Sequence, residues 1–234
     1  MVQTPLSSTH RTNMSTVTLG LGILHACALL LGHVLGSKAT EIGPFVLTLT
    51  ILSFPITFLT TDLLHEHCGP DVARRVSFFS VAAVVLSFLV IQIARLLPTS
   101  SSSHLPLGAF EHVLVAPLAH VVVVLMGYLV GQLGDISLFH WIRQRSQGRK
   151  LWMRVLVSTA AGESLNAMVL SALLLLLPGT VSVATSEPFV VRFVSLQGLA
   201  RLAVVISLLP VVYALHAIIA THDARELPHP RLGS

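Results

Sequence analysis

The feature that most constrains this chain is a series of apolar runs, each about 20 residues long, separated by short polar connections. A helix of that length crosses a hydrocarbon core of roughly 30 Å. Hydrophobic residues make up 53% of the chain and charged residues only 10%, against about 25% charged in an ordinary soluble domain. The sequence therefore predicts an all-α polytopic membrane protein without a separate soluble domain.

The apolar runs predict six transmembrane helices. In lipid a helix satisfies its own backbone groups, and the strand alternation of a β-barrel is absent from these runs. The first run is longer than the hydrophobic region of a signal peptide, so we expect it to be retained. We expect one transmembrane domain over 16–220, with polar tails at 1–15 and 221–234 and helices at 16–37, 43–63, 76–97, 112–140, 152–177 and 190–220.

Lysine and arginine in the short connections predict the orientation. The second and fourth connections hold most of them: Arg74, Arg75, Arg143, Arg145, Arg149, Lys150 and Arg154. With these connections on the cytoplasmic side, six helices place both termini in the cytoplasm. The basic residues neither share one amphipathic face nor alternate with stacking aromatic residues, so we expect a lipid bilayer and no nucleic-acid partner.

Polar side chains inside the predicted helices are the candidate functional residues. A buried charge costs roughly 2.5–3.5 kcal/mol on insertion scales and usually marks a substrate or ion pathway. Thr159, Glu163 and Asn166 are spaced four and then three apart, which places them on one helical face. The alternative is structural support, in which Glu163 pairs with Arg201, or Asp135 shares a proton within the bundle.

The predicted fourth helix carries a second polar face. Tyr128, Gln132 and Asp135 recur at spacings of four and three, with Phe139 one turn further on. An aromatic ring, an amide and a carboxylate suit a flat heterocycle, because the ring stacks on it while the polar groups bind its edge. For Phe139 ordinary packing is the preferred interpretation.

Two further acids lie near the end of the predicted second helix. Asp62 and Glu66 are four apart, so their charges repel unless they reach water or a basic partner such as Arg74 or Arg75. A structural clamp and a gate are equally compatible with this spacing. Arg201 in the last helix also needs a carboxylate or a ligand, because arginine is not readily neutralised.

Histidine is abundant, with 12 residues in the chain, and the densest cluster is His65-Glu66-His67-Cys68. Consecutive residues on a helix point in different directions, whereas a tetrahedral zinc site uses spacings such as i, i+4. We therefore expect packed or interfacial histidines and no metal site.

Four short motifs follow one another between His33 and Tyr213. The first is Phe54-Pro55 followed by Asp62-Leu-Leu-His-Glu66-His-Cys-Gly69, and the second is Gly131-Gln-Leu-Gly-Asp135-Ile-Ser-Leu-Phe139. Leu151-Trp152-Met-Arg154 with Ser158-Thr159 comes next, and Arg201 with Pro210-Val-Val-Tyr213 is last. In order and spacing, these motifs resemble those of the queuosine precursor transporter family, also called the vitamin uptake transporter family.

The resemblance implies a multi-pass protein of the bacterial inner membrane that is not an enzyme and uses no cofactor. Its implied substrates are precursors of the tRNA base queuosine, 7-cyano- and 7-aminomethyl-7-deazaguanine. The family tends to have Gln and then Asp three residues on, where this chain has Glu163 and Asn166. One acid and one amide thus remain on the same face, and a carboxylate fits the ring N–H and exocyclic amine of a deazaguanine.

We therefore expect a substrate site near the middle of the bilayer. Its expected residues are Asp62, Glu66, Tyr128, Gln132, Asp135, Thr159, Glu163, Asn166 and Arg201. One alternative is a substrate-binding membrane subunit of an ATP-driven vitamin uptake system, since the chain lacks a phosphate-binding G-x-x-x-x-G-K-[ST] loop. Another is an intramembrane metal-dependent enzyme, against which stands the absence of G-x-S-x-G and H-E-x-x-H motifs.

Overall fold

The computed structural model describes residues 8–42, 45–98, 100, 110, 118–147, 150–177 and 187–226. This part of the chain is mainly helical, as predicted, with one small hairpin near the N-terminal end. The elements are α1 (Ser8–Leu35), β1 (Ala39–Ile42), β2 (Phe45–Thr48), the 3-10 helix η1 (Leu49–Leu52), α2 (Phe54–Cys68), α3 (Pro70–Arg95), α5 (Leu118–Arg145), α6 (Leu151–Leu176) and α7 (Glu187–Glu226).

Five helices within the described residues are long and apolar enough to cross a membrane. They are Thr16–Leu35, Pro70–Arg95, His120–Arg145, Leu151–Leu176 and Val191–Thr221. These correspond to five of the six predicted spans. The connection between the helices predicted at 76–97 and 112–140 lies mostly outside the described residues.

The helix predicted at 43–63 is the exception, because β2, η1 and the start of α2 occupy this stretch. Proline explains where α2 begins, since Pro55 lies at its first turn and has no N–H to donate to a preceding turn. β1 and β2 pair antiparallel, with Ala39 opposite Thr48 and Ile42 opposite Phe45. The apolar run is therefore a broken segment, which we define as β2, η1 and α2.

A sharp turn joins α2 to α3. Gly69 separates the two helices with a φ of 90°, a conformation that costs glycine little because it has no Cβ. Proline at the first turn of α3 then starts the next helix without losing a hydrogen bond. The glycine of the first motif therefore sets the direction in which α3 leaves α2.

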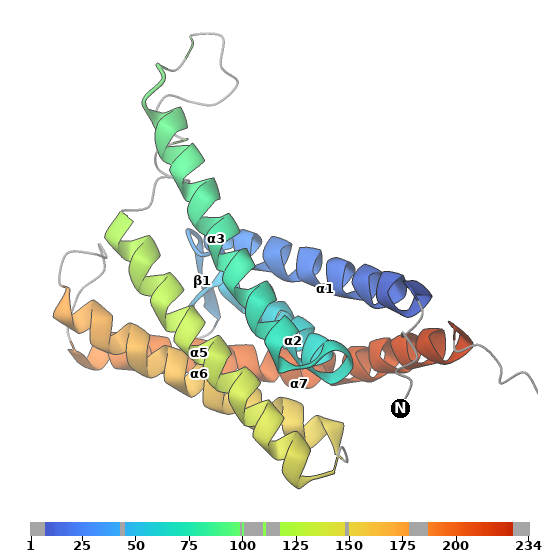
Figure 1. Cartoon of the computed structure of the whole chain (residues 1–234). Helices are drawn as coiled ribbons and strands as arrows, with labels where there is room; N and C mark the ends of the chain where they lie inside the picture. Colours follow the sequence, from blue (N-terminus) through green and yellow to red (C-terminus); the bar gives the residue numbers. More distant parts are fainter. Residues whose placement is uncertain are drawn as a thin grey trace, which may run out of the picture.

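Helices α5 and α6 lie side by side, as Figure 1 shows. Their backbones approach closely at Gly131 and Gly162. A Cβ added to Gly131 would lie 2.6 Å from the Gly162 carbonyl oxygen, and one added to Gly162 would lie 2.8 Å from the Gly131 oxygen. Small residues allow such an approach, which supplies packing where lipid gives no hydrophobic drive for helix association.

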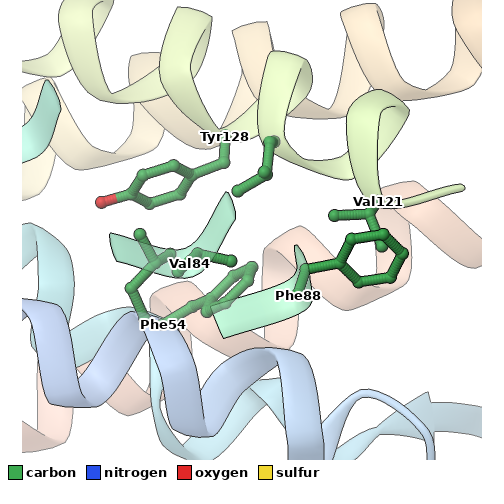
Figure 2. Packing of buried hydrophobic residues seen from close by; sticks show 7 residues of the cluster. Phe54, Val84, Phe88, Val121 and Tyr128 are labelled. Carbon is green, nitrogen blue, oxygen red and sulfur yellow. The ribbon is translucent and has the colours of Figure 1, made fainter. Parts of the chain in front are cut away.

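One hydrophobic cluster joins α1, α2, α3 and α5, and Figure 2 shows Phe54 and Tyr128 within it beside Val84, Phe88 and Val121. A second cluster lies among α2, α5, α6 and α7 and includes Phe139 and Val155. Phe139 is fully buried there, in agreement with its predicted packing role. Buried polar side chains on the same helices form the candidate site.

Candidate functional site

The broken segment is bound to α7 by the amide of Gln197. Its Oε1 accepts from the Thr48 backbone N–H at 3.0 Å, and its Nε2 donates to the Thr48 carbonyl at 3.0 Å. The same Nε2 is 2.8 Å from the Thr50 hydroxyl. A single side chain thus satisfies backbone groups where the chain is not α-helical and helical hydrogen bonds are absent. Buried backbone groups outside regular helices require such partners.

Arg201, one turn after Gln197, joins the broken segment to α6. Its Nη1 lies 3.1 Å from Glu163 Oε2, and its Nη2 donates to the Thr50 hydroxyl at 3.2 Å. The guanidinium carbon also lies 4.5 Å from the centre of the Phe54 ring, a cation–π contact. The predicted pairing of Glu163 with Arg201 is therefore present, and both side chains are buried.

Glu163 keeps one oxygen without a partner. Asn166 Nδ2 donates to Oε2 at 3.4 Å, so two donors converge on that oxygen, whereas Oε1 is buried and has no hydrogen-bond partner among the described residues. Glu163 also lines a half-open cavity of about 520 Å³ between α6 and α7. Three serines, Ser164, Ser171 and Ser195, are among its lining residues. A carboxylate held in place beside an open volume is suited to accept hydrogen bonds from a ligand.

A second polar group lies where α2, α5 and α6 meet. Asp62 is buried and interacts electrostatically with Asp135, which also lies next to the Ser158 and Thr159 hydroxyls. Gln132 donates to Thr61 at 2.6 Å. Within this group, four residues have buried oxygens without hydrogen-bond partners among the described residues: Asp62 Oδ2, both oxygens of Asp135, Gln132 Oε1 and Thr159 Oγ1.

Tyr128 lies beside this group but faces α1. Its hydroxyl is 2.9 Å from His25 Nε2, and His25 Nδ1 contacts the Thr57 carbonyl and the Thr60 hydroxyl at 3.1 and 3.0 Å. The Tyr128 ring packs against Phe54 with their centres 5.8 Å apart. In this structure the ring is part of the hydrophobic cluster. Its stacking on a substrate stays a prediction.

Glu66 lies one turn after Asp62, in an ion-pair network at the end of α2. Arg154 binds it through two hydrogen bonds of 2.9 and 3.3 Å, and Arg143 Nε lies 3.3 Å from its Oε2. Arg143 also donates to the Glu66 carbonyl at 3.1 Å, which caps the helix. The basic partners of Glu66 are thus Arg143 and Arg154, whereas Arg74, one of the partners considered from the sequence, pairs with Asp71.

The structure thus places eight of the nine predicted site residues in three neighbourhoods, whereas Tyr128 faces α1 and His25. Glu163, Asn166 and Arg201 lie together, Asp62 joins the α5 and α6 polar residues, and Glu66 lies in the ion-pair network. Among the residues that the structure describes, no group of three or more His, Cys, Asp or Glu side chains is placed to hold a metal ion.

Sequence reasoning missed several residues that complete these neighbourhoods. Gln197, Thr50 and His25 are polar residues within apolar runs, and that was their available signal. Arg154 was assigned only to the basic connection, although its position within a family-like motif pointed to a role. Their partners are far away in sequence, so spacing alone did not indicate them.

The motifs are matched by comparisons with known proteins. A family model described as "Putative vitamin uptake transporter" matches residues 48–215. The queuosine precursor transporter of Escherichia coli (strain K12) is 27% identical over 143 residues, and the match spans 61% of this chain and 61% of that relative. No solved structure is significantly similar. The family match covers most of the chain and all three polar neighbourhoods, and the chain therefore belongs to the vitamin uptake transporter family.

Proposed function

We propose that this chain imports queuosine precursors, 7-cyano- or 7-aminomethyl-7-deazaguanine, across the bacterial inner membrane. The observation that carries the proposal is the buried Glu163 carboxylate, whose Oε1 has no partner among the described residues and which lines the cavity between α6 and α7. The relative from Escherichia coli, a queuosine precursor transporter, supports the same substrate class.

The chemistry of the cavity fits a flat and polar heterocycle. Its volume of about 520 Å³ lies within the roughly 300–1,000 Å³ of small-molecule sites. Glu163 Oε2 already has Arg201 and Asn166 as donors, so Oε1 provides the remaining acceptor positions. A deazaguanine edge has a ring N–H beside an exocyclic amine, and both donate hydrogen bonds. A buried carboxylate oxygen that accepts from them distinguishes this edge from an apolar ring.

The broken segment supports a transport mechanism. In this proposal it crosses the membrane as the sixth span, since α2 covers about 22 Å and η1 adds about 8 Å, close to the hydrocarbon thickness of about 30 Å. Six crossings place both termini on the cytoplasmic side with the basic connections. Discontinuous helices of this kind commonly form substrate sites in transporters. Arg201 links the broken segment to Glu163, so substrate binding at Glu163 is communicated to it.

The test uses cells that lack both queuosine precursor synthesis and their own importer. Expression of this chain with added 7-cyano-7-deazaguanine is expected to restore queuosine in tRNA. Glu163→Gln is expected to abolish restoration while membrane insertion persists, because an amide provides one acceptor oxygen and brings a competing donor. The control is Asp71→Asn, which neutralises an exposed acid on α3. Restoration by Glu163→Gln at the wild-type level would refute the site.

A second measurement separates a solitary importer from a subunit of an ATP-driven system. Liposomes containing only the purified chain are expected to take up the labelled precursor without ATP. If uptake required a separate ATP-hydrolysing protein, the alternative subunit role would replace the proposal.

A further inference from the structure

The polar group between α2, α5 and α6 is separate from the Glu163 cavity and has a different composition. Its buried atoms that lack a hydrogen bond of ordinary geometry are all oxygens, from Asp62, Gln132, Asp135 and Thr159, and the Ser158 and Thr159 hydroxyls lie next to Asp135. Such a set accepts hydrogen bonds or binds a positive charge, and a heterocycle edge that presents N–H donors already has an acceptor at Glu163. This group of oxygen acceptors is therefore suited to bind a small cation.

Packing brings the two aspartates to this place. A Cβ on Gly162 would lie 2.9 Å from Asp135 Cβ and 3.1 Å from Phe58 Cε1, so α5 and α2 both press against α6 at this glycine. Asp62 follows Phe58 by one helical turn and interacts electrostatically with Asp135. Both carboxylates are almost completely buried. Two buried like charges that act on one another repel, so neutralising one of them stabilises the pair.

Basic side chains around the pair are already engaged with other acids. The charged groups that act on Asp62, apart from Asp135, are Arg154 and Glu66, and the one that acts on Asp135 from α6 is Glu163. Arg154 is bound through both terminal nitrogens to Glu66. Glu163 forms an ion pair with Arg201 on α7. Neither aspartate forms an ion pair with an arginine or lysine of the described residues.

From this arrangement we propose that Asp62 and Asp135 together bind one transported proton, which couples movement of the substrate to the proton gradient. This inference rests on the proposed transport function. The proton comes from water on the outer side, binds a carboxylate oxygen of the pair, and leaves to water on the cytoplasmic side. The hydroxyl of Thr159 lies beside Asp135, one turn before Glu163 on α6. The proton and substrate sites are thus adjacent on one helix.

The first arm of the test measures accumulation by the full chain in liposomes. The probe is labelled 7-cyano-7-deazaguanine, which is uncharged, and the membrane potential is held at zero with potassium and valinomycin. An inward gradient of about one pH unit stores about 1.4 kcal/mol per proton, so one proton per substrate supports about tenfold accumulation. A sodium gradient of the same size is expected to give none. Accumulation driven by sodium, or none driven by acid outside, would overturn the proton assignment.

The second arm measures counterflow, the exchange of labelled for unlabelled substrate without any gradient. Asp135→Asn and Asp62→Asn mimic a permanently protonated site, so both are expected to keep counterflow and lose the tenfold accumulation. Asp71→Asn, the exposed acid on α3, is expected to keep both. An Asn variant that still accumulates substrate tenfold would contradict the proposal. Loss of counterflow in both Asn variants would assign the two aspartates to substrate binding, and this result would also overturn the proposal.

A third measurement needs no variant. A pH-sensitive dye inside liposomes that contain the wild-type chain is expected to report about one proton entering per substrate. Substrate entry without proton entry contradicts the coupling site alone. Absence of counterflow in the wild-type chain contradicts the proposed function itself, so the two failures are distinguishable.

Discussion

Replacing Gly162 with alanine tests the closest approach between α5 and α6. The new methyl group would lie 2.8 Å from the Gly131 carbonyl oxygen, 2.9 Å from Asp135 Cβ and 3.1 Å from Phe58 Cε1. The first contact is to backbone and the second is to an atom that side-chain rotation cannot move. Relief therefore requires α5 to shift away from α6, which also displaces Asp135.

Overpacking of this kind costs about 1–3 kcal/mol, and two immovable neighbours place Gly162→Ala in the upper half of that range. For a protein of this size each kcal/mol lowers Tm by about 2–4 °C, so a loss of about 4–12 °C is expected. Thermal unfolding of the purified protein in detergent, followed by circular dichroism, measures it. Gly131→Ala is expected to cost a similar amount, and the double variant less than the sum, because one shift relieves both clashes.

The matched control is Gly20→Ala on α1, where an added Cβ meets nothing within 4 Å. It is expected to keep or raise Tm, since alanine favours a helix over glycine by about 1 kcal/mol. Equal Tm values for Gly162→Ala and Gly20→Ala would refute the close approach of α5 and α6.

Three other substitutions test separate contacts. Gln197→Leu removes the amide that binds the Thr48 N–H and carbonyl, so we expect a lower Tm and loss of uptake in liposomes. Uptake at the wild-type level would contradict this expectation. Glu66→Gln removes the negative charge that Arg143 and Arg154 bind, and we expect a loss of about 1–3 kcal/mol, measured as a lower Tm, with an unchanged Tm as the contrary result. Tyr213→Phe removes the acceptor that binds a backbone N–H in the first turn of α6 at 3.1 Å. Its expected cost is about 1 kcal/mol, and an unchanged Tm would exclude this contact.

Residue spacing correctly predicted the features that depend on one helix alone. Glu163 and Asn166 were placed on one face by their separation of three, and the structure joins them by a hydrogen bond. Five spans followed from length and hydropathy, because a helix in lipid needs no distant partner to satisfy its backbone. The requirement that Arg201 find a carboxylate also followed from its charge, and Glu163 is that carboxylate.

Interactions between distant parts of the chain were not predictable from spacing. Glu66 and Arg154 are 88 positions apart, and Thr48 and Gln197 are 149 apart. Neither pair follows from helical periodicity. The break before α2 was indicated only by Pro55, because the surrounding residues are as apolar as those of a continuous span. Hydropathy measures transfer into lipid, and it does not record which backbone groups a neighbouring side chain satisfies.

The position of Arg201 explains how one helix serves two purposes. Gln197 and Arg201 lie four apart on the same face of α7, so the first binds the backbone of the broken segment and the second binds Glu163 and Thr50. A movement of α7 relative to α6 that separates Arg201 from Glu163 therefore also pulls on the broken segment. Such a movement leaves a buried acid uncompensated unless a hydrogen-bond donor replaces the guanidinium. Under the proposed function, a heterocycle that donates to Glu163 is such a donor, and substrate binding is then expected to lower the energetic cost of opening.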